Sequence, residues 1–137
     1  MTDLLFVDTS VWFALVNRRD PDHRAARAAL ESFRGRLVTT NYVFDETVTL
    51  CLYRLGHDVA LRVGDELRDG KLADLVRAGV ADETAAWDLF RRRTDKQYSF
   101  TDCVSFVLMR KLGIEQAAAL DDDFKREGFT SVPQRRT

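Results

Sequence analysis

The first buried strand expected in this chain ends on an acid. The apolar run Leu4–Val7 is short and continuous, as in a central parallel strand that is buried on both faces. Asp8 follows at once, with Thr9 and Ser10 next, where the strand should give way to a helix. In an open α/β sheet, ligands bind at the edge formed by the carboxyl ends of the strands. A carboxylate at this place therefore predicts an α/β fold with a polar site at one edge of its sheet.

Segments with strand and helix patterns alternate along the chain. Besides the first run, strand patterns cover residues 37–40, 72–76, 117–120 and 129–132. Helical patterns separate them, and no internal repeat or linker interrupts the alternation. We therefore expect a single domain over residues 1–137, with a central, mostly parallel sheet of four to five strands between helices on both faces.

Capping residues mark the expected starts of three helices. Asp20 is expected to cap a helix that has Pro21 at its first position, and Asn41 to cap the next one. Either Ser99 or Thr101 caps a later helix. These positions decide where the acids discussed below lie within their helices.

A basic cluster follows the helix that is expected after Gly79. The inner face of that helix is predicted to include Leu89 and Phe90. Arg91–Arg93 and Lys96 come next, yet the 21 basic and 22 acidic residues leave a net charge of −1, so no global positive field attracts nucleic acid. Such a cluster can contact phosphates locally, although a solvated helix face is the commoner interpretation.

The composition fits a protein with one core and no membrane span. A chain of 137 residues with 45% hydrophobic residues can bury one substantial core. Cys51 and Cys103 lie in apolar helical patterns without a metal-ligand spacing, so we expect free, buried thiols and a reducing compartment. The N-terminus has no secretory leader pattern, and no apolar run approaches the ~20 residues that cross a bilayer. We therefore expect a cytoplasmic protein with no membrane partner.

Four acids stand in apolar contexts far apart along the chain. Asp8 leaves the first strand and Asp121 leaves the fourth, so the two meet at one edge of the sheet if those strands are neighbours. Glu46 and Asp102 lie early in helices that can bring them to the same edge. A lone buried carboxylate is costly, whereas several can share a divalent cation. The sequence therefore predicts a metal site made of acids.

The chemistry of that site follows from its ligands. Carboxylates without His or Cys select hard cations, here Mg²⁺ or Mn²⁺. One or two such ions can activate water and stabilise charge on a phosphodiester. Without metal, the carboxylates repel one another, which raises the pKa of some of them. The hydroxyls of Ser10 and Ser105 can orient ligands or bond to helix carbonyls instead.

Each acid also has a purely structural interpretation. Asp8 can cap the helix that follows it, and Asp102 can be a first-turn acid that the helix dipole favours. Glu46 can pair with Arg54, and Asp121 can cap a short helix. The metal site requires all four acids to meet in space, which only the fold can arrange.

Four phrases carry a more specific signal. They are Val7–Trp12, Phe44–Thr47, Tyr98–Phe106, and Leu120–Phe124 with Gly128-Phe129. In this order they resemble the acidic motifs of the PIN-domain family, and in particular those of its VapC-type toxins. The likeness covers nearly the whole chain, from Phe6 to Phe129, and the phrase Tyr98–Phe106 is its most specific part.

The resemblance implies a three-layer α/β/α PIN-like fold and a Mg²⁺- or Mn²⁺-dependent endoribonuclease that acts as the toxin of a type II toxin–antitoxin system. It implies that Asp8, Glu46, Asp102 and Asp121 form the catalytic and metal-binding set. RNA is the implied substrate, a cognate antitoxin the implied inhibitor and a homodimer the implied assembly. The family commonly has a His two positions after its last acid; this chain has Asp123 there, either as a fifth metal ligand or as a helix cap.

Two other functions are open at this stage. One is a catalytically silent PIN-fold module that binds RNA or a protein, which the presence of all four acids disfavours. The other is an aspartate-based phosphotransfer protein, which also places acids at strand ends. Phosphatases of that kind have a second acid two residues after the nucleophile, and receivers have an acidic pair. Asp8 is followed by Thr9 and Ser10 instead, and Asp3 is too far upstream to complete a pair.

Overall fold

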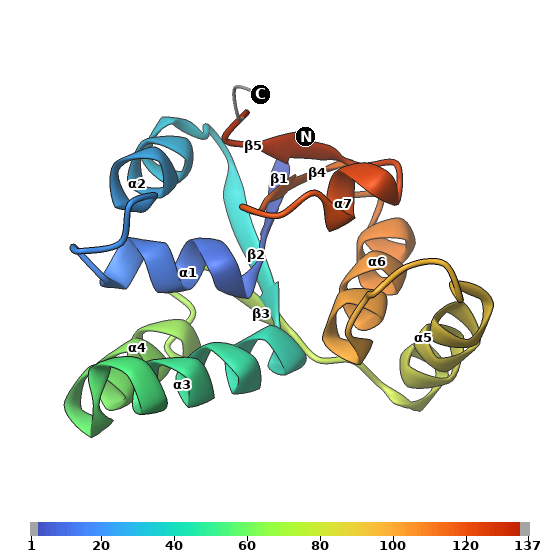
Figure 1. The fold of residues 1–137 in the computed structure, drawn as a ribbon, viewed down its shortest axis with the longest axis horizontal. Coiled ribbons are helices and arrows are strands. Elements are labelled where there is room, and N and C mark those ends of the chain that lie inside the picture. The colour runs from blue at the N-terminus through green and yellow to red at the C-terminus, as the bar shows by residue number, and fades with distance from the viewer. Residues whose placement is uncertain (1–2, 135–137) are drawn as a thin grey trace.

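The computed structural model describes residues 3–134 and places one sheet between two groups of helices (Figure 1). The elements follow one another in the order β1 (Leu4–Val7), α1 (Thr9–Val16), α2 (His23–Ser32), β2 (Arg36–Thr40), α3 (Asn41–Leu55), α4 (His57–Arg68), β3 (Asp74–Val76), α5 (Val80–Arg92), α6 (Phe100–Leu112), β4 (Gln116–Ala118), α7 (Asp123–Arg126) and β5 (Thr130–Val132). The predicted alternation of strands and helices is confirmed.

The sheet has five strands in the order β3-β2-β1-β4-β5, and every neighbouring pair is parallel. From β1 the chain moves outward through β2 to β3, then returns to the other side of β1 to add β4 and β5. The order therefore reverses between β1 and β4, and in open α/β sheets the carboxyl ends of the strands at such a point form the ligand crevice. The predicted α/β class is confirmed, with five strands and no antiparallel pair among the described residues.

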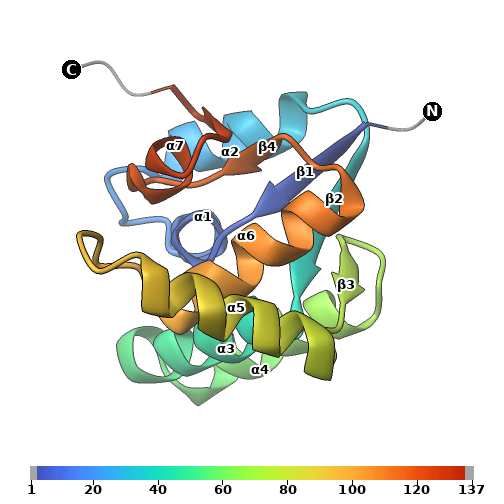
Figure 2. The same ribbon diagram turned by 90° about the vertical axis from the view of Figure 1, so that its right-hand side faces the viewer.

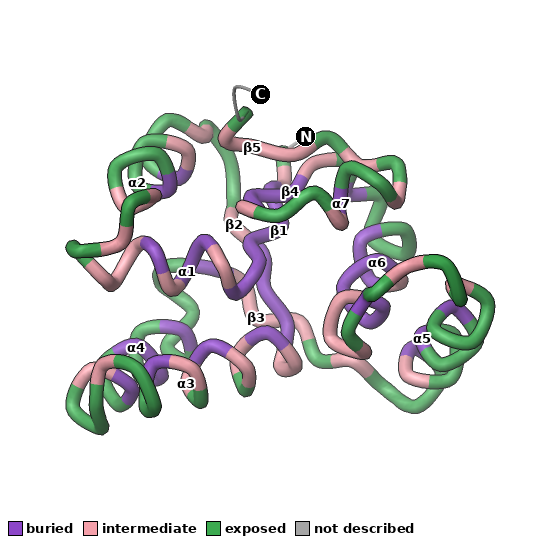
Figure 3. The backbone as a smooth tube through the Cα atoms, viewed as in Figure 1, coloured by how far each residue is buried: buried purple, intermediate pink, exposed green. Residues whose placement is uncertain are grey.

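Helices cover both faces of the sheet. Helices α1 and α2 lie against one face, with α3 and α4 on the same side, whereas α5 and α6 lie on the other side (Figures 1 and 2). Burial is concentrated in the central strands and in the inward faces of the helices (Figure 3). This arrangement leaves the carboxyl ends of β1 and β4 near the starts of α1 and α6.

Aromatic and aliphatic side chains fill the space between the layers. In β1, Leu5 and Val7 are fully buried and Phe6 is 1% exposed, as expected for a central parallel strand. Phe106 of α6 packs edge-on against Phe124 of α7, with ring centroids 4.9 Å apart. Such rings supply much of the apolar area that this core buries.

Two helix starts differ from the sequence-based expectation. Helix α2 begins at His23, because Asp20 accepts a hydrogen bond from the backbone N–H of Asp22 (2.8 Å) and closes a turn ahead of the helix. Helix α3 is capped by Thr40, whose Oγ1 accepts from the N–H of Val43 (3.1 Å). Asn41 is already helical, and its side chain accepts from the N–H of Ala78 (2.8 Å) instead. Asp20 thus stabilises a turn, and Asn41 makes a tertiary contact, so neither residue caps its helix.

The inner face of α5 is narrower than its apolar pattern predicts. Leu89 is 2% exposed, as expected, but Phe90 is 42% exposed. Phe90 follows Trp87 by three positions and therefore lies on the same outer side of the helix, where the two rings are stacked. Within residues 3–134, no helix is both long enough and apolar enough to cross a membrane.

Loss of the α3 cap should destabilise the fold measurably. We expect Thr40→Ala to lower the free energy of unfolding by about 1 kcal/mol, because the N–H of Val43 loses its acceptor. Thr40→Ser keeps the acceptor and should recover most of the loss. Urea denaturation checks this, with Thr49→Ala, at an exposed position of the same helix, as the control. Equal effects of the two alanine variants would contradict the cap's role.

Candidate active site

Asp8 lies directly after β1, beside the carboxyl end of β4. It is 4% exposed, and its N–H donates to the carbonyl of Ala118 (2.9 Å), so it extends the pairing of the two strands. It stands at the N-cap position of α1, yet its side chain makes no capping hydrogen bond. Its carboxylate accepts from the hydroxyl of Ser10 at 3.0 Å instead. The capping interpretation of Asp8 is therefore right for the backbone position and wrong for the side chain.

Ser10 connects Asp8 to the loop that carries Asp121. The Ser10 hydroxyl donates to Asp8 Oδ2, and the same Oγ accepts from the N–H of Leu120 at 3.1 Å. Asp121 comes next and is exposed, and its Oδ1 accepts from the N–H of Asp123 at 3.0 Å. The two strand ends thus deliver one buried and one exposed carboxylate to the same edge of the sheet.

Asp102 lies in the first turn of α6 and belongs to a capping box. Its Oδ2 accepts from the N–H of Ser99 (2.9 Å), and its own N–H donates to the hydroxyl of Ser99 (3.0 Å). Ser99, rather than Thr101, is therefore the cap. This pair of bonds fixes both the start of the helix and the direction of the carboxylate.

Glu46 reaches the site from the second turn of α3. The neighbouring Thr47 donates from its hydroxyl to that of Thr9 (3.4 Å), which joins α3 to the start of α1 beside Asp8. Within the described part of the chain, Glu46 makes no ion pair, so the alternative partnership with Arg54 is not formed. Glu46 is left half-buried with a free carboxylate.

The electrostatics show that these side chains share one site. Burial and, to a lesser extent, the charges of Asp102, Asp121 and Glu46 together raise the pKa of Asp8 to about 8, against the lowering effect of the Ser10 hydroxyl. Asp8 forms no ion pair with Lys or Arg anywhere in residues 3–134. Three neighbouring acids therefore disfavour the ionised form of this buried carboxyl, and no Lys or Arg within residues 3–134 pairs with it.

Asp102 and Asp123 belong to the same electrostatic group. The pKa of Asp102 is raised to about 6, chiefly by burial and also by the charges of Asp121 and Asp123, while the hydrogen bonds with Ser99 lower it. The pKa of Asp123 is also raised, first by burial and then by Asp121, although Arg126 bonds to its Oδ1 at 3.3 Å. We call Asp8, Glu46, Asp102, Asp121 and Asp123 the acidic rim.

The acidic rim has the donor chemistry of a site for a hard divalent cation. Every donor is a carboxylate oxygen, and Asp8 and Asp102 each use only Oδ2 in hydrogen bonds within the described chain, which leaves Oδ1 available. Among residues 3–134, however, no three acidic, Cys or His side chains already converge to form a ready metal cage. The residues fit Mg²⁺ or Mn²⁺ in donor type only.

The structure decides between alternative roles for three polar residues near the acidic rim, namely Asp123, Ser105 and Ser99. Asp123 is the first residue of the short helix α7, whose N-cap is Asp122, so a helix cap is not its role. Ser105 donates to the carbonyl of Thr101 (2.9 Å), which is the structural alternative for that hydroxyl. The S-x-x-D spacing of Ser99 and Asp102 is a capping-box signal that could have decided between the two expected caps.

With this geometry established, the comparison with known proteins is direct. Residues 5–129 match the PIN domain family. This chain belongs to that family. The membership and the VapC-type resemblance are confirmed, and no basis remains for the phosphotransfer alternative.

The relatives of this PIN domain include named ribonucleases. The 23S rRNA-specific endonuclease VapC20 of Mycobacterium tuberculosis is 39% identical over 132 residues, which are 94% of this chain and 98% of that protein. The ribonuclease VapC26 of the same organism is 28% identical over 85% of this chain and 86% of its own length. A VapC ribonuclease of Archaeoglobus fulgidus is 29% identical over 80% of this chain and 72% of its own length.

Solved structures agree with this fold. The crystal structure of M. tuberculosis VapC20, a Sarcin-Ricin loop cleaving toxin, has a TM-score of 0.88 and 36% identity, covering 92% of this chain and 96% of that one. VapBC-1 from nontypeable Haemophilus influenzae has a TM-score of 0.67 at 11% identity over 93% of this chain and 96% of that one, a likeness of fold alone. Together they confirm the predicted PIN-like architecture.

The raised pKa of Asp8 should make the free energy of unfolding depend on pH. A folded-state pKa near 8, against 3.8 for the free group, means that folded Asp8 keeps its proton while unfolded chains lose theirs. Without metal, the free energy of unfolding should therefore fall as pH rises from about 4 to about 8. Asp8→Asn lacks this effect, so its stability relative to the unmodified protein should rise by at least ~1 kcal/mol between pH 5 and pH 8.

Urea denaturation in EDTA at the two pH values measures this difference. Asp45→Asn, at the exposed position next to Glu46, is the matched control and should show no comparable change. The free energies of unfolding of Asp8→Asn and of the unmodified protein are compared at each pH. If they differ by the same amount at pH 5 and pH 8, the Asp8 carboxyl is not held protonated by its surroundings.

Proposed function

We propose that this protein is a metal-dependent endoribonuclease that cleaves the sarcin–ricin loop of 23S rRNA, and that it is the toxin of a type II toxin–antitoxin system. The proposal rests chiefly on one observation: this chain aligns with 98% of the length of a 23S rRNA-specific endonuclease at 39% identity. It is also supported by the electrostatic coupling of Asp8, Asp102, Asp121 and Glu46 at the edge where ligands bind in this class of sheet.

We assign the metal-binding role to Asp8, Glu46, Asp102 and Asp121, with Asp123 as an accessory acid next to Asp102. A bound Mg²⁺ or Mn²⁺ supplies Lewis-acid stabilisation of charge on the phosphodiester and lowers the pKa of a nearby water. Its positive charge would offset the charges of the neighbouring acids, which contribute to the raised pKa of Asp8.

Two serines hold the acids in place for this role. Ser10 fixes Asp8 Oδ2 and, through the N–H of Leu120, the approach of the Asp121 loop. Ser99 fixes Asp102 Oδ2 and donates no hydrogen bond to Oδ1. Positioning bonds of this kind determine the orientation of metal ligands and thereby the affinity of the site.

The partners follow from the same assignment. A toxin of this class needs a cognate antitoxin to silence it, and the structural likeness to a VapBC toxin is compatible with such a partner. The homodimer and the cytoplasmic location stay predictions from the sequence. Light scattering during size-exclusion chromatography tests the first of these directly.

The alternative of a catalytically silent PIN module draws on one observation. Within residues 3–134, no three potential ligands are already close enough to hold a metal. A silent module would bind RNA or a protein without needing such a cluster. Calorimetry with Mn²⁺ separates the two functions, because no binding at millimolar Mn²⁺ favours the silent module.

Loss of one central acid should abolish cleavage. We expect Asp8→Asn and Asp102→Asn to reduce the rate of cleavage of a sarcin–ricin loop RNA by on the order of 100-fold or more, since each removes a charge that the cation needs. The readout is gel analysis of the labelled RNA in Mg²⁺ or Mn²⁺, with EDTA as the blank.

Asp45→Asn and Asp122→Asn are the matched controls. Both positions are exposed and each adjoins a residue of the acidic rim, so these variants change local charge without removing a proposed ligand. They should cleave at a rate near that of the unmodified protein. Retained cleavage by either Asp8→Asn or Asp102→Asn, with folding shown by circular dichroism, would reject the proposed function.

A further inference from the structure

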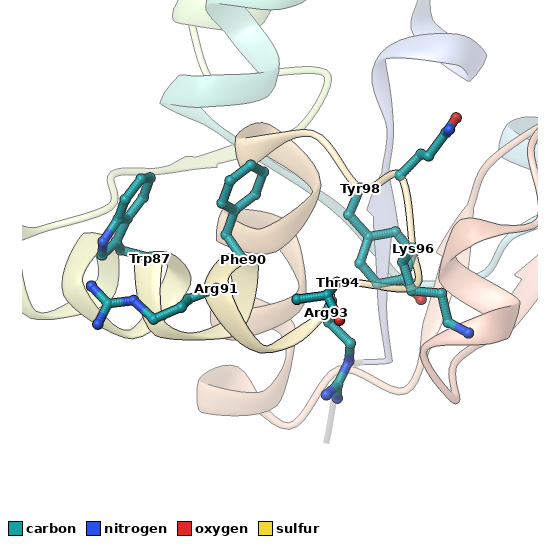
Figure 4. A pocket seen from close by; sticks show the side chains of 8 residues that line it. Trp87, Phe90, Arg91, Arg93, Thr94, Lys96 and Tyr98 are labelled. Atoms are coloured by element: carbon teal, nitrogen blue, oxygen red, sulfur yellow. The ribbon is translucent and has the colours of Figure 1, made fainter.

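Helix α5 carries two aromatic rings on the outside of the protein. Trp87 and Phe90 are 51% and 42% exposed. Their rings are stacked, with centroids 5.5 Å apart and planes 17° from parallel. Figure 4 shows both side chains rising from the same side of α5. The rest of the described chain leaves part of both rings exposed to solvent. We call Trp87 and Phe90 the stacking platform.

A groove of roughly 610 Å³ runs from the stacking platform along the loop between α5 and α6. Basic side chains line it together with the rings, namely Arg91, Arg93 and Lys96 (Figure 4). Arg93 is bound to Glu127 and Lys96 to Asp95, whereas Arg91 makes no ion pair within residues 3–134. The groove is therefore lined by two exposed rings and by a guanidinium that has no ion-pair partner within residues 3–134.

Further rings connect the stacking platform to the acidic rim. Trp87 contacts Phe100, with centroids 6.3 Å apart, and Phe100 contacts Tyr42 edge-on at 5.7 Å. Phe100 is the first residue of α6, two positions before Asp102. Tyr42 is on α3, the helix that carries Glu46, and its hydroxyl donates to Glu83 of α5. A row of rings thus leads from the groove to the helices that hold two of the acids.

We propose that the stacking platform and Arg91 bind a single-stranded segment of RNA next to the phosphodiester that is cleaved, with one or more bases stacked on Trp87 and Phe90 and a phosphate on Arg91. This assignment rests on the proposed function for the nature of the polymer. The proposed binding site lies outside the acidic rim, and α5 is the element that holds the flanking nucleotides.

The charges favour RNA over an apolar partner. The acidic rim repels the phosphates of its own substrate, and the net charge of −1 supplies no general attraction. A local cation with exposed aromatic faces meets that need, since proteins bind unpaired bases by stacking on aromatic side chains and hold the backbone with Arg or Lys. Single-stranded loops present bases in the form that such a surface can take.

Kinetics with loop RNA test the proposal. Trp87→Ala should raise KM roughly 5- to 100-fold and change kcat little, because the loss of a base–aromatic stack weakens binding of substrate and transition state alike. Trp87→Phe keeps a flat ring and should restore most of the affinity. Arg91→Gln should raise KM and weaken its salt dependence.

The matched controls lie on the other group of helices. Tyr53 is 80% exposed on α3, and Arg62 is exposed on α4. Tyr53→Ala and Arg62→Gln remove the same kinds of side chain from surfaces that are not part of the groove. Both variants should leave KM and kcat unchanged.

Fluorescence gives a readout that does not depend on cleavage. The chain has two tryptophans, and Trp12 is buried at 1% exposure with its Nε1–H donating to Thr39 (3.3 Å). Quenching by loop RNA in an Asp8→Asn background should therefore come from Trp87 and disappear in Asp8→Asn combined with Trp87→Phe. A base stacked on the indole produces this quenching, whereas binding at the acidic rim alone does not.

The outcomes separate this proposal from the proposed function. Cleavage by the unmodified protein, with no quenching and an unchanged KM in Trp87→Ala, overturns the RNA platform and leaves the nuclease intact. Quenching in the Asp8→Asn background together with no cleavage by the unmodified protein supports the platform and rejects the nuclease. If Trp87→Ala instead converts an oligomer to a monomer in light scattering and leaves KM unchanged, a second copy of the chain covers this surface and the platform is rejected.

Discussion

A buried carboxylate that forms no ion pair with Lys or Arg within residues 3–134 dominates this structure. Asp8 sits where the order of the parallel strands reverses, is almost inaccessible, and faces the charges of three other acids. A protein gains no stability from such a group, because burial and like charges both disfavour its ionised form. The arrangement makes sense as a site that is completed by something positive.

The surrounding bonds hold that unfavourable arrangement in place. Ser10 ties the end of β1 to the loop after β4, and the pair of bonds between Ser99 and Asp102 fixes the start of α6. Farther out, Glu127 is a buried anchor for the loop between α5 and α6. Burial raises its pKa, but hydrogen bonds from Arg93 and Arg110 prevail and lower the pKa to about 2. Glu127 thus has two guanidinium partners, whereas Asp8 has a hydroxyl donor and no ion pair within residues 3–134.

The sequence predicted this site in part, and the limits have physical causes. Asp8 and Asp121 follow from strand patterns, since the carboxyl ends of parallel strands share an edge. Glu46 could be placed only by the fold, because the Thr47 to Thr9 contact joins residues 38 positions apart. The expectation that Asp20 caps a helix is wrong, because an Asp can close a turn as readily as it caps a helix. Phe90 was expected inside because apolar periodicity does not distinguish a core ring from one held against Trp87 at the surface.

The most direct measurement is the titration of the Asp8 carboxyl by ¹³C NMR, with and without Mg²⁺. The account predicts a pKa near 8 in EDTA, from burial and the neighbouring acids, and a large fall when the cation binds. An ordinary carboxyl pKa in EDTA, or one that does not change with Mg²⁺, would contradict it.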